Sequence, residues 1–451
     1  MEPFPARFAL VARKKTAALF QSAEGVITAR DFLAAAARLA AALPAGGMVL
    51  NLCEDRLSFA LGFAAAMIAG CESALSSDRS PARVRELAAR LGTAAILSER
   101  PASAAPCPTI TVDPSALLAS TNPAGEWANP EFAGEMPAAT VFTSGSTGEP
   151  VAHRKRWGAL HARSHAAAMR FGLAAEAPVS LVGTVPPQHM YGFETTVLLA
   201  LHCPVTSWCG PTFFPHDIAA ALAAMPAPRL LVTTPLQLRA LLDAGLTLPP
   251  LALVISATAP LAADLAARAE ACWQTRVAEI FGATEAGSIA SRITTAGEIW
   301  EAYPGLHLTA DAEGVVSVAA PFAETVALAD ALELLAPGRF RLLGRRSDVI
   351  KLGGKRASLA ALTRILTAIE GVEDGVFVAP GDLDAEPTAR LLAFVVAPGR
   401  EPAAILAALR REIDPIFLPR RVIPVPRLPR NEFGKLNATH LAALAGTSTS
   451  G

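Results

Sequence analysis

The sequence predicts an α/β fold: a large N-terminal domain of parallel-rich sheets with a small β-rich subdomain, followed by a small α+β C-terminal domain. Two observations lead to this prediction. Between residues 31 and 281, short apolar runs that suit buried strands alternate with helix-like runs, a pattern typical of a mainly parallel sheet. From residue 299 to residue 343 the pattern changes to short runs of alternating polarity, which indicates antiparallel strands.

The elements can be placed in order along the chain. Helices are expected at 31–43, 59–69 and 81–91 and in a run that ends at Arg170. Strands are expected at 49–52, 94–97, 138–142, 181–185, 230–233, 253–256 and 277–281. The proline-containing stretch 101–135 is expected to be loop-like. In the C-terminal part, the small α+β unit has expected helices at 359–369 and 403–413 and strands at 376–378 and 392–396.

The chain is organised around residues 143–150, which read TSGSTGEP and follow the strand 138–142. Gly145 and Gly148 let the main chain turn tightly and point its N–H groups inward, which makes a nest for an anion. Hydroxyl groups add neutral donors for phosphate oxygens, and they come from Thr143, Ser144, Ser146 and Thr147. An ordinary loop is also rich in these residues, so local composition supports both interpretations equally. The stretch lacks the Gly-Lys-Ser/Thr ending of the nucleoside-triphosphatase loop.

A second candidate site follows the strand 277–281, which runs into GATEAG. Thr284 and Glu285 would lie at the carboxyl end of this strand, where open α/β sheets bind ligands. A hydroxyl beside a carboxylate suits a phosphate with Mg²⁺, because Mg²⁺ prefers hard oxygen ligands.

Two other groups of residues each allow two interpretations, and a third indicates a hinge. The basic run 153–156 fits phosphate contacts and equally fits a solvated helix start. The segment PPQHMYGFE carries His189, Tyr191 and Phe193, which suit the wall of a small-molecule pocket, although composition favours packed core residues. Seven basic residues between 339 and 356 are interrupted by glycines, which indicates tight turns and a hinge.

Composition argues against several classes of protein, among them nucleic-acid-binding, membrane and secreted proteins. The chain has 451 residues, 52% of them hydrophobic, and a net charge of −1, so electrostatics give no case for binding nucleic acid or an anionic membrane. The six cysteines form no CxxC pair and read as reduced, mostly buried thiols. The N-terminus lacks the pattern of a signal peptide, and the longest apolar run, 57–71, is better suited to a buried helix than to a membrane span. We therefore expect a cytoplasmic protein.

Taken together, these motifs resemble the adenylate-forming superfamily of acyl- and aryl-CoA synthetases, luciferases and adenylation domains of peptide synthetases. The resemblance runs from about residue 49 to residue 435 and rests on the order and spacing of TSGSTGEP, PPQHMYG, SATAPL, FGATE, LLGRRSD and PRNEFGK. It implies formation of an acyl-adenylate from ATP and a carboxylic acid, with Mg²⁺ as cofactor, AMP and pyrophosphate as products and a thiol as acceptor.

The resemblance also implies site roles. The phosphates would contact Thr143, Ser144, Gly145, Ser146, Thr147 and Gly148. The adenine would contact Ala257, Thr258 and Ala259. Thr284, with Phe281 and Gly282 beside it, would contact the α-phosphate, and Glu285 would hold Mg²⁺. The ribose hydroxyls would be gripped by Asp330 and Arg345, and Lys435 would be the mobile lysine of the adenylation step. The carboxylate pocket would have His189 as its gate and Tyr191, Phe193 and Gly282 around it.

The same resemblance implies three parts: an adenylation core at 1–343, a hinge at 344–348 with Ser347 at the pivot, and a mobile C-terminal domain at 349–451. The sequence departs from the family pattern at Val151, where lysine is usual, and Lys155 or Arg154 is a candidate replacement. Ser347 stands where the family usually has Asp or Lys. The interval between Glu285 and Asp330 is short, which indicates a trimmed β-rich subdomain.

The chain's length and motifs are most similar to bacterial ligases that load 3- or 4-hydroxybenzoate onto an acyl carrier protein for aryl-polyene pigments such as xanthomonadin. Tyr191 beside the gate histidine, with Phe193, suggests a compact, partly polar pocket for an aromatic acid. An aryl- or acyl-CoA synthetase that uses CoA is the alternative. A nucleotide-binding relative with impaired catalysis is a second alternative, motivated by Val151.

Overall fold

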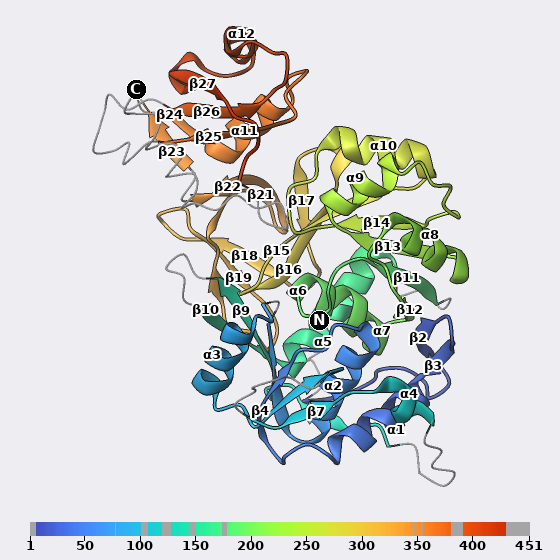
Figure 1. The fold of residues 1–451 in the computed structure, drawn as a ribbon. Coiled ribbons are helices and arrows are strands. Elements are labelled where there is room, and N and C mark those ends of the chain that lie inside the picture. Colours follow the sequence, from blue (N-terminus) through green and yellow to red (C-terminus); the bar gives the residue numbers. More distant parts are fainter. Residues whose placement is uncertain are drawn as a thin grey trace. The chain divides into compact units, whose positions relative to one another are not determined.

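The structure of the protein is a computed structural model that describes residues 6–76, 78–100, 107–119, 128–144, 150–173, 178–346, 349–352, 355–379 and 391–429. The chain divides into two compact units. The first comprises Met1–Gly297, Glu301–His307 and Val318–Val326, and the second Glu298–Trp300, Leu308–Ser317 and Ala327–Gly451. Figure 1 shows the elements of both units in their order along the chain.

The first unit contains a six-stranded sheet in the order β10-β9-β5-β4-β6-β7. Its strands are β4 (Gly47–Asn51), β5 (Cys71–Leu75), β6 (Ala95–Ser98), β7 (Thr109–Thr111), β9 (Pro137–Ser144) and β10 (Pro150–Arg156). All neighbours run parallel except β9 and β10, which form an antiparallel hairpin. This hairpin flanks the predicted phosphate loop.

A second sheet of the first unit contains the run β16-β15-β14-β13-β11-β12-β2-β3. Its strands are β2 (Ala18–Ser22), β3 (Gly25–Thr28), β11 (Val179–Gly183), β12 (Val205–Trp208), β13 (Arg229–Thr233), β14 (Leu253–Ser256), β15 (Val277–Ala283) and β16 (Gly287–Ile293). From β15 to β2 the neighbours are parallel, whereas β15–β16 and β2–β3 are antiparallel. The carboxyl ends of the central strands therefore meet at the same edge.

Local sequence explains where the helices of the first unit begin. Helix α1 (Ala29–Ala40) starts at Thr28, whose side chain forms a capping box with Asp31. Helix α2 (Arg56–Ile68) starts at Asp55, whose carboxylate accepts from the amide of Ser58. The other helices are α3 (Pro81–Leu91), α4 (Pro114–Ala119), α5 (Trp157–Phe171), α8 (Pro215–Ala224), α9 (Pro235–Asp243) and α10 (Ala263–Trp273).

A continuous helical stretch follows the PPQH segment. It begins with α6 (Met190–Gly192), widens into a π-helical segment at Phe193–Leu198 and ends with α7 (Leu199–His202). The hydroxyls of Thr195 and Thr196 each donate to the carbonyl four residues earlier, those of Tyr191 and Gly192. π-helical turns often occur at functional sites, because they turn side chains to directions that a regular α-helix does not offer.

Two large apolar clusters hold much of the first unit together. One places Phe32, Phe59, Phe63, Trp157 and Phe193 between helices α1, α2 and α5 and the π-helical segment. The other joins α8, α9 and α10 to the second sheet, and Figure 1 shows α9 and α10 side by side there. Burial of this apolar surface is the main favourable term in folding.

The second unit contains the antiparallel pair β21 (Asp330–Ala336) and β22 (Arg339–Arg345). It continues with β23 (Val349–Leu352), β24 (Lys355–Ser358), α11 (Leu359–Thr367), β25 (Asp374–Val378), β26 (Leu392–Val396), α12 (Pro402–Glu412) and β27 (Arg421–Pro424). Leu366, Phe377, Ile405 and Leu409 form its core. The short strands β17 (Ile299–Ala302), β18 (His307–Ala310), β19 (Val316–Ala319) and β20 (Val326–Ala327) lie where the chain alternates between the two units.

The predicted α/β class is confirmed, and three local expectations are wrong. Residues 153–156 belong to strand β10, because they pair with β9, and do not begin a helix. The stretch 101–135 contains β7, α4 and β8 (Glu131–Ala133), of which β7 extends the six-stranded sheet. The apolar run 57–71 is a buried helix only as far as Ile68, since Cys71 begins the central strand β5.

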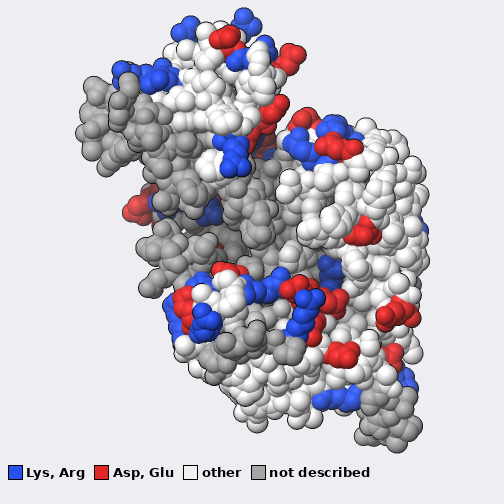
Figure 2. Space-filling model, in the orientation of Figure 1, with Lys and Arg blue, Asp and Glu red and all other residues white. Residues whose placement is uncertain are grey.

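The surface charges, the helices and the cysteines of the structure agree with what composition led us to expect. On the face drawn in Figure 2, acidic and basic side chains of the described residues lie interspersed. Among the residues that the structure describes, no helix combines the length and apolar character that crossing a membrane requires. All six cysteines are free, and four of them, Cys53, Cys71, Cys203 and Cys209, are buried as expected.

Candidate active site

The hairpin β9–β10 carries the predicted phosphate loop. Thr143 and Ser144 end strand β9, while Gly145, Ser146, Thr147 and Gly148 lie outside the described residues. Val151 is paired with Thr143 in the hairpin and is 49% exposed. The structure therefore places Val151 directly beside the end of β9, where a lysine is usual in the resembling family.

The two candidate replacements for that lysine have other partners. Arg154 forms an ion pair with Glu72 of β5, with 2.9 Å between Nη2 and Oε2. Lys155 is only 8% exposed, and its Nζ donates to the main-chain carbonyl of Glu285 at 2.7 Å. Burial lowers the pKa of Lys155 from its ordinary 10.5 to about 8. Lys155 is thus directed toward the turn after β15.

Thr284 and Glu285 lie in the turn between β15 and β16, and both are partly exposed. Gly282 and Gly287 make this turn possible. A Cβ on Gly282 would lie 2.6 Å from the carbonyl oxygen of Gly287, and Gly287 has a φ of 77°, which favours glycine. Phe281, one residue before Gly282, is buried.

Three buried charged side chains contact this turn, and we call Lys155, Arg163 and Glu194 the buried charge cluster. Arg163 of α5 donates to the carbonyls of Ala286, at 3.0 Å, and Ser288. Glu194 of the π-helical segment accepts from the amide of Ser288 at 3.0 Å and from its hydroxyl. Burial lowers the pKa of Arg163, and the nearby Glu194 carboxylate opposes that shift. Neither Arg163 nor Glu194 was among the site residues expected from the sequence.

The segment predicted to contact adenine begins at the carboxyl end of β14. Thr258 has a φ of 79°, a conformation that is costly for a β-branched residue and is concentrated at functional sites. The segment is anchored by Glu279, which accepts from the amide of Leu261 at 2.8 Å and pairs with Arg292 at 2.7 Å. Ala257 is buried, whereas Ala259 is partly exposed.

The predicted acid-pocket residues have different environments. His189 is partly exposed, and its Nδ1 accepts from the amide of Tyr191. The hydroxyl of Tyr191 donates to the carbonyls of Thr233 and Ile255, at the ends of β13 and β14, and burial raises its pKa. Phe193 has no exposed surface and packs against Phe63, so the structure places it in the core and not at a pocket wall.

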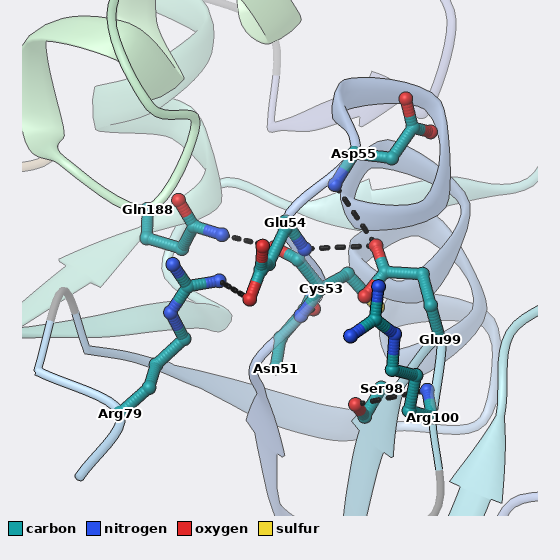
Figure 3. A network of polar contacts seen from close by, with 9 residues as sticks. All are labelled: Asn51, Cys53, Glu54, Asp55, Arg79, Ser98, Glu99, Arg100 and Gln188. Carbon is teal, nitrogen blue, oxygen red and sulfur yellow. Dashed lines mark hydrogen bonds and ion pairs between the residues drawn. The ribbon is translucent and has the colours of Figure 1, made fainter.

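A polar network fixes the segment that leads to His189 (Figure 3). The side-chain amide of Gln188 donates to the carbonyl of Cys53, just after β4. The adjoining amides of Glu54 and Asp55 both donate to one carboxylate oxygen of Glu99, at 2.8 and 2.9 Å. These contacts link the end of the six-stranded sheet to the segment with His189, and the sequence alone gave no sign of them because the partners lie far apart in the chain.

Two predicted ribose contacts lie together in the second unit. Asp330 and Arg345 are paired residues of β21 and β22, with 3.3 Å between the Nε of Arg345 and the Oδ1 of Asp330. Asp330 is buried, while the Arg345 side chain is 54% exposed. Ser347 and Lys435 lie outside the described residues. In the described part of the chain, no group of three His, Cys, Asp or Glu side chains could hold a metal ion.

Comparison with known proteins identifies the family to which this chain belongs. A model of the AMP-binding enzyme family matches residues 6–338. A 4-coumarate–CoA ligase of Halorhodospira halophila is 31% identical over 309 residues, which cover 66% of this chain and 74% of that protein. A 4-coumarate–CoA ligase of Rhodobacter capsulatus is 30% identical over 280 residues, which cover 62% of this chain and 68% of that protein.

Solved structures share the fold. The anthranilate CoA ligase AuaEII in complex with anthranoyl-AMP matches with a TM-score of 0.80 at 16% identity, over 99% of each chain. ATP-bound MatB from Rhodopseudomonas palustris matches with a TM-score of 0.80 at 19% identity, over 96% of each chain. At these identities the likeness shows the fold alone. Together with the family match, the curated relatives show that this chain belongs to the AMP-binding enzyme family, which uses ATP and Mg²⁺, and that it is an AMP-forming acid–thiol ligase.

Proposed function

We propose that this ligase activates an aromatic carboxylic acid, 3- or 4-hydroxybenzoate, and transfers the acyl group to the phosphopantetheine thiol of an acyl carrier protein. The observation that carries the adenylation step is the hydrogen bond from Lys155 to Glu285. It joins strand β10, which directly follows the predicted phosphate loop, to the turn that holds Thr284 and Glu285. Two segments 130 residues apart are thereby brought together, as a phosphate site at this position requires.

The proposed chemistry has two steps. A carboxylate oxygen of the acid forms a bond to the α-phosphorus of ATP, and the bond from that phosphorus to pyrophosphate breaks. The thiol sulfur then forms a bond to the acyl carbon, and AMP leaves with the former carboxylate oxygen. In the first step Thr284 would donate its hydroxyl proton to an α-phosphate oxygen, and Lys435 would stabilise the negative charge that builds up there.

The residues at the turn fit Mg²⁺. Mg²⁺ usually keeps several waters and is held in nucleotide sites by one or two carboxylates together with substrate phosphates. Glu285 supplies one partly exposed carboxylate, while its main chain is fixed by Lys155. When bound, Mg²⁺ neutralises part of the phosphate charge. We propose Glu285 as its protein ligand.

The preference for a compact acid rests on Tyr191. Its ring is buried and its hydroxyl is held by the ends of β13 and β14. We infer that it limits the room for a long acyl chain beside these strand ends. Thr184 is partly exposed at the same edge, and its hydroxyl, which lies 3.1 Å from that of the buried Thr233, would offer a polar group to a ring hydroxyl. The names of the curated relatives, 4-coumarate–CoA ligases, agree with an aromatic acid.

CoA is the alternative acceptor, and the relatives' names favour it, since both are named CoA ligases. The basic stretch between residues 339 and 356 suits the phosphates of CoA as well as the acidic surface of a carrier protein. We also propose the division into 1–343, the hinge 344–348 around Ser347 and the mobile domain 349–451, with Asp330 and Arg345 on the ribose.

Carboxylate-dependent exchange of pyrophosphate into ATP tests this proposal. The acids to compare are benzoate, 3- and 4-hydroxybenzoate, 4-coumarate and short and long fatty acids. We expect the highest kcat/KM with a hydroxybenzoate, and a preference for a fatty acid would contradict the compact pocket. A competition between CoA and a phosphopantetheinylated carrier protein then decides the acceptor. Absence of exchange with every acid would favour the impaired relative.

A further inference from the structure

The buried charge cluster is unusual because three ionisable side chains converge on one turn. Lys155 comes from β10, Arg163 from α5 and Glu194 from the π-helical segment, and each is less than 9% exposed. Burial of charged groups is costly unless they are paired or hydrogen-bonded. All three have such partners, and these partners belong to the stretch Glu285–Ser288.

Apart from the bond from the Ser288 hydroxyl to Glu194, the contacts are made with the main chain of this stretch. The carbonyls of Glu285, Ala286 and Ser288 accept from Lys155 or Arg163, and the Ser288 amide donates to Glu194. These hydrogen bonds are not made with the side chains of Thr284 and Glu285, although the Glu285 carboxylate also raises the pKa of Lys155 against the effect of burial. The turn is therefore held from its buried side, while the side chains with proposed phosphate and Mg²⁺ contacts are partly exposed.

Gly287 fits this arrangement. Its φ of 77° lets the chain turn, and a Cβ at this position would lie 2.6 Å from Oε1 of Glu194. The close approach of the carboxylate to the turn therefore depends on glycine. Arg163 and Lys155 also face Glu194 electrostatically, since its carboxylate raises the pKa of both side chains against the effect of burial.

We propose that Lys155, Arg163 and Glu194 are positioning residues that hold the turn after β15 so that Thr284 and Glu285 present their side chains to the phosphates and Mg²⁺. This inference rests on the function proposed above. A charge cluster with a purely structural role would stabilise the unit without favouring the nucleotide over the acid. The two roles can therefore be separated by kinetics and by local measurements on the turn.

Helix α5 offers a matched control. Arg170 lies seven residues after Arg163, donates to the side chain of Ser291 at 2.8 Å and pairs with Glu301 at 2.6 Å. It thus contacts the same strand β16, but beyond the turn. Arg163→Lys and Arg170→Lys each keep the charge and remove the guanidinium fork. Glu194→Gln keeps the shape of the side chain and removes its charge.

Amide hydrogen exchange of the ligand-free protein tests the positioning without any assay of activity. We expect Arg163→Lys and Glu194→Gln to speed exchange in the peptide that covers residues 283–288 by about tenfold or more, because each loses a charge-assisted hydrogen bond. Arg170→Lys should leave this peptide unchanged. Equal exchange in wild type, Arg163→Lys and Glu194→Gln would overturn the proposal, as would the same increase in Arg170→Lys.

Kinetics then test the consequence for the site. In pyrophosphate exchange, Arg163→Lys and Glu194→Gln should lower kcat/KM for Mg²⁺·ATP by about tenfold or more and raise the Mg²⁺ concentration needed for half-maximal rate, with the KM of the acid unchanged. A rise in the KM of the acid alone would overturn the inference. If Arg163→Lys does not fold, Glu194→Gln decides both measurements. Failure of wild type to exchange would reject the proposed function and leave the hydrogen-exchange result to decide whether the cluster holds the turn.

Discussion

Replacing Lys155 by methionine tests whether a buried ammonium lies beneath the active-site turn. Burial lowers the pKa of Lys155 from 10.5 to about 8, and a difference of this size corresponds to about 3 kcal/mol between the folded and unfolded states. Below pH 8 the ammonium is charged in both states, and the folded state bears the full desolvation cost. Between pH 8 and pH 10.5 the folded protein loses this proton while the unfolded chain keeps it, so stability rises with pH.

The measurement is the free energy of unfolding from urea denaturation at several pH values between 7 and 10.5. We expect wild type to gain up to about 3 kcal/mol relative to Lys155→Met over this range, because methionine has a similar length and no titrating group. Tyrosines and cysteines titrate alike in both proteins and cancel in the difference. Parallel pH curves for the two proteins would refute the reasoning.

The neighbouring Arg154 gives the control. Its side chain is 62% exposed, and because arginine side chains do not deprotonate in proteins, Arg154→Met should shift stability by a constant amount. A pH-dependent difference for Arg154→Met of the same size as for Lys155→Met would show that the effect does not come from the buried ammonium.

Four further predictions address the site and the core. Glu285→Gln should lower kcat/KM for Mg²⁺·ATP by about 100-fold, and unchanged kinetics would remove Glu285 from the metal site. Lys435→Ala should slow adenylate formation by about 100-fold or more but leave thioester formation from a supplied acyl-adenylate intact, and equal loss of both steps would contradict its role. His189→Ala should change the ratio of kcat/KM between hydroxybenzoates and 4-coumarate more than the KM of ATP; the reverse result would move His189 out of the acid pocket. Phe193→Ala should lower the free energy of unfolding by about 3–5 kcal/mol because the side chain is fully buried, and a loss below 1 kcal/mol would contradict its place in the core.

Local sequence was enough to predict much of the fold. Helix α3 was predicted with the bounds that the structure has, since Pro81 favours the first helical turn and Gly92, with a φ of 58°, ends the helix in a left-handed conformation. Strands β13 and β14 were predicted because short apolar runs between turn residues suit buried parallel strands. Where long-range pairing decided the conformation, as for β5 and β10, the prediction was wrong.

For the candidate site, too, some features follow from local sequence and others depend on contacts with distant residues. The order of the motifs was sufficient to place Thr284, Glu285 and Thr258 at the carboxyl ends of strands, because in a parallel sheet these ends share one edge. Composition favoured core packing for the segment with His189, Tyr191 and Phe193, and the burial of Phe193 agrees with it. The sequence could not show that the Tyr191 hydroxyl binds two strand ends, since its partners lie far along the chain.

The sequence by itself determined the α/β class, the bounds of helix α3 and the residue types that nucleotide chemistry needs, because these depend on periodicity, helix-end residues and motif spacing. Only the tertiary structure decided which charges lie under the turn of Glu285. Lys155, Arg163 and Glu194 stand up to 39 positions apart and up to 130 positions from the carbonyls and amides that they contact. Their roles arise from burial and from hydrogen bonds with distant main-chain groups. Local sequence patterns do not predict such contacts.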